Sequence, residues 1–226
     1  MCSIIGYSGS EIAAPIIVKG LKRMEYRGYD SVGVATESEN QIELKKGTGK
    51  VTEVNSKFQL DTLPGRIGIG HTRWATHGKV TDLNAHPHPS NSGKIAIVHN
   101  GIIENFEELK KQLEDDGYSF KSETDSEIIA NLLQKNYEST KNVKDTIMKT
   151  VSAIKGHYAF VAMFENGQLA AARFHEPLII GVGQENIFLS SDVLGFIEYT
   201  DNAIYMKSGN FVILENKEFE IGRAHV

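Results

Sequence analysis

The spacing of apolar and polar positions changes twice along this chain, and these changes predict strands near both ends with helices between them. The N-terminal part favours a strand over residues 2–7, a helix over 11–24, paired strands over 32–36 and 41–45, a short helix over 49–58 and strands over 66–72 and 94–99. Amphipathic spacing then predicts helices over 106–116, 124–137 and 142–155. The strand pattern returns over 158–164, 169–174, 178–182, 187–190, 203–206 and 211–214.

This order of elements predicts one α+β domain in which two sheets are sandwiched between helices. Local signals refine the expectation. The alternating Gly68 and Gly70 indicate close packing against the strand over 66–72. Asn100-Gly101 is a turn signal after the strand over 94–99, and residues 124–127 (Thr-Asp-Ser-Glu) predict a capping box at the start of a helix.

Composition narrows the class of protein and its partners. The 226 residues are 40% hydrophobic and 23% charged with a net charge of −5, which is ordinary for a globular protein and argues against a nucleic-acid partner. No apolar run approaches the roughly 20 residues that cross a bilayer, and no secretory signal is visible, so we expect no membrane partner and a cytoplasmic location. The single cysteine excludes an internal disulfide framework and a cysteine-rich zinc site.

That single cysteine, Cys2, directly follows Met1. If Met1 is removed, one residue carries both a thiol and an α-amine whose reference pKa of about 7.7–8.0 lies close to cellular pH. Such an amine can take the thiol proton, which is the chemistry of an N-terminal nucleophile. The alternative is an inert cysteine buried in the first strand, and position alone does not separate the two.

Further polar residues gather where two predicted strands end. Residues 71–78 contain Arg73, whose guanidinium fork suits a substrate carboxylate, beside Trp74. In the alternative interpretation, Arg73 is a surface residue and Trp74 a core anchor. Asn100 offers a side-chain amide and Gly101 a backbone N–H, which together could hold a developing oxyanion, although Asn-Gly is also a simple turn.

Asp125 and the histidines also allow more than one interpretation. A carboxylate in the first turn of a helix favours the helix dipole, and it could equally receive a substrate ammonium group. A metal site could draw on His71, His77, His86, His88 and His99. Zinc needs a complete ligand set in suitable geometry, and no H-x-x-x-H spacing or cysteine pair supports one. We therefore expect structural or hydrogen-bonding roles for the histidines, with no metal and no cofactor.

Several longer motifs occur in a fixed order: Met1-Cys2, then residues 25–31 (Glu-Tyr-Arg-Gly-Tyr-Asp-Ser), 71–78 (His-Thr-Arg-Trp-Ala-Thr-His-Gly), 84–88 (Asn-Ala-His-Pro-His), 99–105 (His-Asn-Gly-Ile-Ile-Glu-Asn) and 122–125 (Ser-Glu-Thr-Asp). Together they closely resemble the glutaminase domains of the glutamine–fructose-6-phosphate aminotransferase family, also called glucosamine-6-phosphate synthases. These are class II glutamine amidotransferases. The match covers nearly the whole chain. The residues of the motifs at 25–31 and 71–78 favour this aminosugar branch over the purine-pathway branch.

The resemblance implies an N-terminal-nucleophile αββα sandwich of two mostly antiparallel sheets. It also implies hydrolysis of the side-chain amide of L-glutamine through a cysteine thioester, giving glutamate and ammonia. By this resemblance Cys2 is the nucleophile and its freed amine the base, Asn100 and Gly101 form the oxyanion hole, and Arg27 lies near the nucleophile.

The resemblance further implies which residues form the glutamine pocket. Arg73 would hold the carboxylate of glutamine and Asp125 its amino group, while Trp74 would gate the path of ammonia in the complete enzyme. The residues that complete or support the pocket would be Thr76, His77 and His86.

Partners and limits follow from the same resemblance. Ammonia would pass to C-terminal sugar-phosphate isomerase domains for glucosamine 6-phosphate synthesis. These domains are missing from this chain, and the full-length protein is expected to be a homodimer. We expect the amidotransferase domain to occupy residues 1–220 and residues 221–226 (Ile-Gly-Arg-Ala-His-Val) to be a non-native tail.

One position departs from the family pattern. The family usually has glycine after the nucleophile, whereas this chain has Ser3, whose Cβ could crowd the chain there. Ser3 therefore keeps open a second hypothesis, a non-catalytic glutamine-binding regulatory module; a third is the glutaminase domain of another class II amidotransferase. The intact Cys2, Arg73, Asn100 and Asp125 favour the enzyme, and we expect activity to survive at a similar or reduced level.

Overall fold

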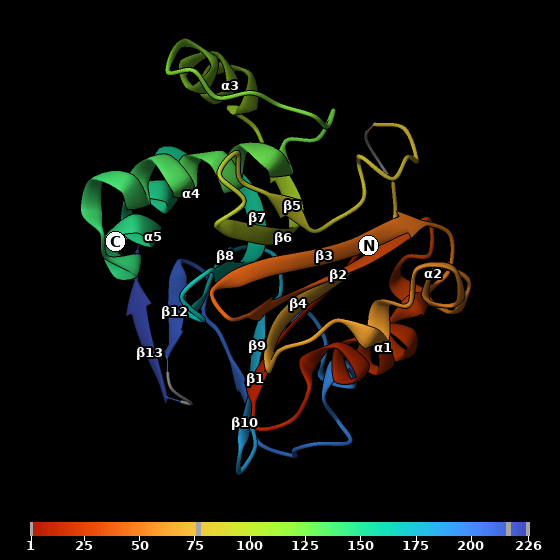
Figure 1. The fold of residues 1–226 in the computed structure, drawn as a ribbon. Coiled ribbons are helices and arrows are strands. Elements are labelled where there is room, and N and C mark those ends of the chain that lie inside the picture. The colour runs from red at the N-terminus through yellow and green to blue at the C-terminus, as the bar shows by residue number, and fades with distance from the viewer. Residues whose placement is uncertain (1, 76–77, 216–217, 225–226) are drawn as a thin grey trace.

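The computed structural model describes residues 2–75, 78–215 and 218–224, which form two antiparallel sheets (Figure 1). The seven-stranded sheet has the spatial order β11 (Ala203–Tyr205), β9 (Ile179–Val182), β10 (Asn186–Ser190), β1 (Ser3–Gly9), β4 (Ile67–Arg73), β2 (Ser31–Ser38) and β3 (Gln41–Thr48). The six-stranded sheet has the order β13 (Glu218–Arg223), β12 (Asn210–Glu215), β8 (Leu169–Phe174), β7 (Gly156–Phe164), β6 (Ile95–Ile103) and β5 (His88–Pro89).

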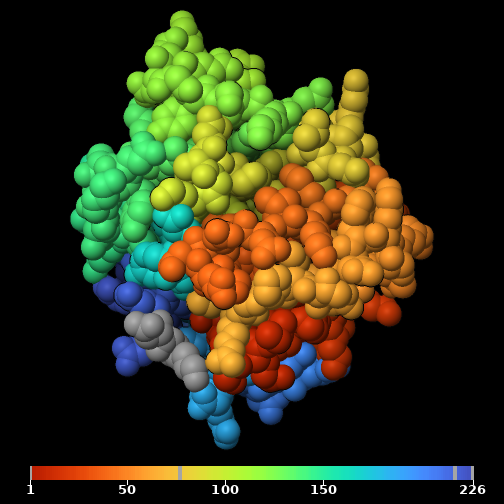
Figure 2. Space-filling model, viewed as in Figure 1, coloured from red at the N-terminus to blue at the C-terminus, as the bar shows by residue number. Residues whose placement is uncertain are grey.

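Helices cover the outer faces of both sheets. The seven-stranded sheet carries α1 (Ala13–Arg23) and α2 (Val51–Phe58), and the six-stranded sheet carries α4 (Ser126–Thr140) and α5 (Val143–Ala153). Packed against α4 is α3 (Phe106–Asp115), which projects at the top of the molecule in Figure 2. Short 3₁₀ helices are η1 (Glu25–Arg27), η2 (Leu60–Thr62) and η3 (Val193–Gly195). The predicted αββα arrangement is therefore confirmed, and none of the helices described is long and apolar enough to span a membrane.

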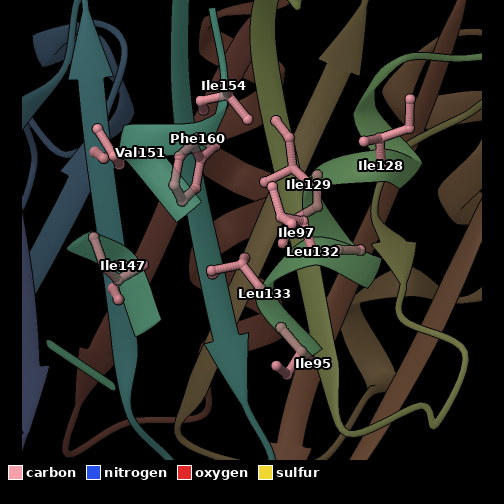
Figure 3. Packing of buried hydrophobic residues seen from close by; sticks show 14 of the residues in the cluster. Ile95, Ile97, Ile128, Ile129, Leu132, Leu133, Ile147, Val151, Ile154 and Phe160 are labelled. Atoms are coloured by element: carbon pink, nitrogen blue, oxygen red, sulfur yellow. The ribbon is translucent and has the colours of Figure 1, made fainter. Parts of the chain in front are cut away.

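Buried apolar side chains hold these layers together. Between the sheets, the cluster includes Ile4 of β1, Ile69 of β4 and Val98 of β6. A second cluster joins α1 and α2 to the seven-stranded sheet. The third, shown in Figure 3, includes Leu133 of α4 and Ile97 of β6. The neighbouring residues Ile97 and Val98 of β6 thus pack on opposite faces of the sheet, as the alternation of side chains along a strand requires.

Alternation also explains the glycines of β4. Ile69 faces the six-stranded sheet, whereas Gly68 and Gly70 face α1. A Cβ at Gly70 would lie 2.4 Å from Cγ2 of Ile17, so the glycines let α1 approach the sheet closely, as predicted. Two residues beyond Ile69, His71 shares its inward face.

The strand β6 is longer than predicted. It does not end in a turn at Asn100-Gly101 but continues to Ile103, with Gly101 paired with Tyr158 of β7. The turn prediction was wrong because Gly101 adopts a φ of +117° inside the ladder, a conformation that glycine tolerates. The dipeptide therefore marks an irregular point in a continuing strand.

The capping box predicted at the start of α4 is also wrong. Asp125 occupies the N-cap position without a side-chain cap. The carboxylate of Glu127 instead accepts the backbone N–H of Lys121 over 3.0 Å and that of Ser122 over 2.7 Å. Glu127 therefore organises the loop before the helix.

The strand β13 was not predicted. It pairs with β12, and the domain boundary expected after residue 220 falls inside it, because Ile221 pairs with Val212. Residues 221–223 thus belong to the six-stranded sheet in this structure, and their foreign origin stays a prediction.

Candidate active site

Residues from both sheets converge at one end of the space between the sheets. Cys2 immediately precedes β1 and lies two residues before the inward-facing Ile4, so strand alternation places the two side chains on the same face. Arg73 ends β4, and Asn100 lies two residues beyond the inward-facing Val98 of β6. The sandwich therefore brings together residues as far apart along the chain as Cys2 and Asn100, which are 98 positions apart.

The Cys2 thiol lies against the backbone of Trp74. The Trp74 N–H donates to Sγ over 3.2 Å, and Sγ lies 3.6 Å from the Trp74 carbonyl oxygen. Burial raises the pKa of the Cys2 thiol, an effect that the Trp74 N–H and the charges of Arg73 and Arg27 oppose. The thiol is therefore protonated at neutral pH, and a base is needed to make it nucleophilic.

The side-chain amide of Asn100 is held at both of its polar atoms. Nδ2 lies 3.2 Å from the Cys2 carbonyl oxygen, to which it donates, and Oδ1 lies 3.0 Å from Nε2 of His71. Because Nδ2 carries two hydrogens, a second N–H is available to an acceptor in the neighbouring cavity. Gly101 lines the same cavity. An amide N–H beside a backbone N–H is the arrangement that stabilises an oxyanion.

The Cys2 carbonyl is held a second time by Arg27. Nε of Arg27 donates to it over 3.2 Å, and Nη1 lies 3.4 Å from Oδ2 of Asp192. Tyr26 donates its hydroxyl to the same carboxylate oxygen over 2.7 Å. Arg27 therefore lies beside Cys2, oriented by an aspartate 165 residues away that no sequence signal indicated.

A cavity of about 160 Å³ opens beside Cys2 and holds a pair of opposite charges. Arg73 is only 6% exposed, and its Nη1 donates to the Lys79 carbonyl over 3.2 Å. The Asp125 carboxylate accepts the N–H of Ile103 over 2.7 Å. A fixed guanidinium and a fixed carboxylate in one cavity complement the carboxylate and ammonium groups of an amino acid.

The segment around η1 packs against the backbone that carries Arg73 and Trp74. A Cβ at Gly28 would lie 2.8 Å from the Trp74 nitrogen, so only glycine permits this approach. The rings of Tyr29 and Trp74 meet edge-on with centroids 5.3 Å apart. The N–H of Asp30 donates to the Arg73 carbonyl over 3.0 Å. This motif thus supports the cavity wall.

The buried histidines connect segments behind the cavity. His86 lines the cavity, stacks on His71 with centroids 4.1 Å apart, and accepts the N–H of His99 over 3.2 Å. His99 in turn lies 2.9 Å from the hydroxyl of Ser126 at the start of α4. Burial lowers the pKa of each of these histidines, and of His88, so their rings are neutral. In the part of the chain that the structure describes, no group of three or more His, Cys, Asp or Glu residues is placed to hold a metal ion.

Ser3, the departure from the family pattern, fits without crowding. It is fully buried in β1, opposite Thr72 of β4, and its hydroxyl donates to the Met24 carbonyl over 3.0 Å. Its Cβ and hydroxyl are therefore accommodated, and no feature of this position speaks against activity.

The structure places most predicted site residues around Cys2, while Thr76 and His77 lie outside the described residues. A second cavity, of about 420 Å³, meets the first at Cys2 and Trp74 and is also lined by Arg27, Glu104, His157 and Glu176. The thiol therefore lies where two openings meet. Sequence analysis missed Asp192 and the contact of His71 with Asn100; for His71, the alternation from Ile69 was the available signal.

Comparisons with known proteins agree with this geometry. A family model described as a glutamine amidotransferase domain matches residues 71–197. The glutamine–fructose-6-phosphate aminotransferase (isomerizing) of Pyrococcus horikoshii is 48% identical over 98% of this chain, and that of Clostridium acetobutylicum is 44% identical over 97%. The chain spans only 37% and 36% of the length of these relatives.

Solved structures share the fold. The chain matches an allosteric regulatory enzyme of purine biosynthesis with a TM-score of 0.88, and a glutamine phosphoribosylpyrophosphate amidotransferase from B. subtilis with a TM-score of 0.86. Both are 29% identical, and the match covers 99% of this chain and 49% of theirs. The domain model covers more than half of the chain, and the relatives match nearly all of it, as the motifs predicted. This chain therefore belongs to the glutamine amidotransferase family.

Proposed function

We propose that this chain hydrolyses the side-chain amide of L-glutamine to glutamate and ammonia, with Cys2 as the nucleophile. The observation that carries the proposal is the meeting of a thiol, an amide donor and a pair of opposite charges around one cavity. Membership of the glutamine amidotransferase family supports the choice of glutamine.

The proposed reaction begins with the removal of Met1, which frees the α-amine of Cys2 to take the thiol proton. The thiolate then attacks the amide carbon of glutamine, and the resulting oxyanion is held by the Asn100 amide and the Gly101 N–H. As the C–N bond breaks, the Cys2 ammonium returns its proton to the departing nitrogen, and ammonia leaves a glutamyl thioester. Water, deprotonated by the same amine, attacks the thioester and releases glutamate and the thiol.

The remaining residues would hold the substrate. In this proposal Arg73 binds the α-carboxylate of glutamine through its guanidinium fork, and Asp125 receives the α-ammonium. His86 supports the cavity wall and Trp74 covers the junction of the two cavities. Thr76 and His77, which lie outside the described residues, would complete or support the pocket.

We further propose a role in a longer protein, because the chain spans about 37% of its named relatives. The ammonia would serve glucosamine 6-phosphate synthesis on sugar-phosphate isomerase domains, in a cytoplasmic homodimer. The names of the relatives, aminotransferases acting on fructose 6-phosphate, support this assignment.

The experiment uses chain whose Met1 is shown by intact mass to be absent. It should release glutamate from glutamine, and a diazoketone analogue of glutamine should label Cys2. The matched control, Cys2→Ala, should show neither result while keeping the urea unfolding transition of the unsubstituted chain. A folded, Met1-free chain without labelling or glutamate release would overturn the proposal in favour of a non-catalytic glutamine-binding module.

A further inference from the structure

We propose that His71 is a positioning residue that fixes the orientation of the Asn100 amide without touching the substrate. The inference rests on the proposed function, since it concerns the same oxyanion site. His71 is buried on the inward face of β4 and lines neither of the cavities that meet at Cys2. Among the residues that His71 contacts, His86 and His99 line only the first cavity, whereas Asn100 lines both and carries the proposed oxyanion donor.

The contacts of His71 define where its proton lies. Nε2 is 3.0 Å from Oδ1 of Asn100 and 3.1 Å from the backbone carbonyl oxygen of His99. A backbone carbonyl only accepts hydrogen bonds, so Nε2 must carry the proton that lies between these two oxygens. The imidazole thus acts as an N–H donor toward β6.

The opposite orientation of the Asn100 amide is excluded by backbone carbonyls on both sides. If Oδ1 and Nδ2 were exchanged, Nε2 of His71 would have to accept, and its lone pair would face the His99 oxygen. Oδ1 would at the same time face the Cys2 carbonyl, which lies 3.2 Å from the atom now at that place. Both contacts would join two acceptors, so the observed orientation is the one that pairs a donor with an acceptor at both places.

The orientation of the Asn100 amide decides whether a hydrogen-bond donor or an acceptor faces the cavity. With Oδ1 held by His71, the N–H groups of Asn100 point to the Cys2 side, where an oxyanion donor must be in place before charge develops. Without the His71 donor, Oδ1 loses a buried partner and the amide can rotate, presenting an acceptor to the oxyanion. The ring of His71 is itself held by stacking on His86, with 18° between the ring planes.

The test compares His71→Met, which removes the donor and keeps much of the volume, with His71→Gln, which keeps an N–H donor at similar reach. His71→Met should lower kcat for glutamate release by about 10- to 100-fold, less than the loss of an oxyanion donor itself, with KM little changed. His71→Gln should recover most of the lost kcat. A folded His71→Met chain with unchanged kcat overturns the inference.

A double-mutant cycle separates positioning from a general structural role. Because His71 acts through Asn100, adding His71→Met to Asn100→Ala should lower kcat little further. A structural role would give the same fold-loss in both backgrounds, so additive losses overturn the inference. Urea unfolding of each variant shows that the chains compared are folded.

The folding and activity of each variant decide how the remaining outcomes are interpreted. If His71→Met does not fold, His71→Phe replaces it, because a planar ring keeps the contact with His86; a folded His71→Gln chain as slow as Asn100→Ala also overturns the inference. If the unsubstituted chain releases no glutamate, the proposed function fails and the inference with it. An active chain whose His71 variants match it overturns the inference alone.

Discussion

Gly101→Ala tests whether the irregular point in β6 is a structural necessity of the site. An ideal Cβ at Gly101 would lie 1.9 Å from the carbonyl oxygen of His157 and 2.9 Å from Cα of Tyr158. Both atoms are backbone of the paired strand β7, so relief requires β6 and β7 to separate. The positive φ adds strain of about 1–3 kcal/mol for a residue with a Cβ, and overpacking adds about 1–3 kcal/mol more. We expect a total loss of about 2–6 kcal/mol in the free energy of unfolding.

Gly117→Ala is the matched control, because Gly117 has a φ of +91° but no atom within 4 Å of its ideal Cβ. It should show the backbone strain without the clash. Urea unfolding of the two variants beside the unsubstituted chain measures the difference, expected to be about 1–3 kcal/mol. Glutamate release should fall for Gly101→Ala and stay unchanged for Gly117→Ala. Equal destabilisation by the two substitutions would refute the steric argument.

Other predictions address the roles of individual groups. Asn100→Ala should lower kcat for glutamate release about 10²–10³-fold with little change in KM, and a loss confined to KM would contradict its oxyanion role. Arg73→Lys should instead raise KM by roughly 10-fold or more, because a charge-assisted hydrogen bond worth about 1.5–3 kcal/mol is lost; unchanged KM in steady-state kinetics would assign the carboxylate to another group. Burial lowers the pKa of His71 from 6.5 to about 3 and lowers those of His86, His88 and His99 as well. The unfolded chain therefore binds protons that the folded chain does not, so stability should be full above pH 6.5 and fall below it by about 1.4 kcal/mol per pH unit for each histidine. Urea unfolding at pH 7.5 and 5.5 measures this, and equal stability would show that the rings are protonated in the fold.

Local sequence patterns predicted most elements because the signals that start and stop them come from residues within or next to the element. The helix expected after Asn142 begins there, since the Asn142 side chain accepts the N–H of Asp145 over 3.0 Å. The strand predicted over 169–174 is β8. By contrast β13 was missed because its apolar Ile221 is 39% exposed on an edge strand with glutamates, so its alternation carries little burial signal.

Residues of the site that belong to a sequence motif could be predicted, whereas their contacts with residues distant in the sequence could not. Arg27 was expected beside Cys2, but nothing in the sequence links it to Asp192. Asp125 left two interpretations open, and the structure shows a contact that neither included. Its carboxylate accepts an N–H from Ile103, in β6, so it ties the helix layer to the strand that carries Asn100 and Gly101, the proposed oxyanion donors. Such pairings depend on how the layers stack, which local periodicity does not encode.

The position of Cys2 and its electrostatics lead to the same requirement. Burial raises the pKa of the thiol in spite of the Trp74 N–H, so the chain does not supply a preformed thiolate. Of the nearby histidines, His71 lines neither cavity beside Cys2, and Nδ1 of His86 accepts the N–H of His99. In the proposed mechanism the base is the α-amine of Cys2, which is free only when the bond to Met1 has been cut. The proposed catalysis therefore depends on that cleavage as strictly as on the thiol itself.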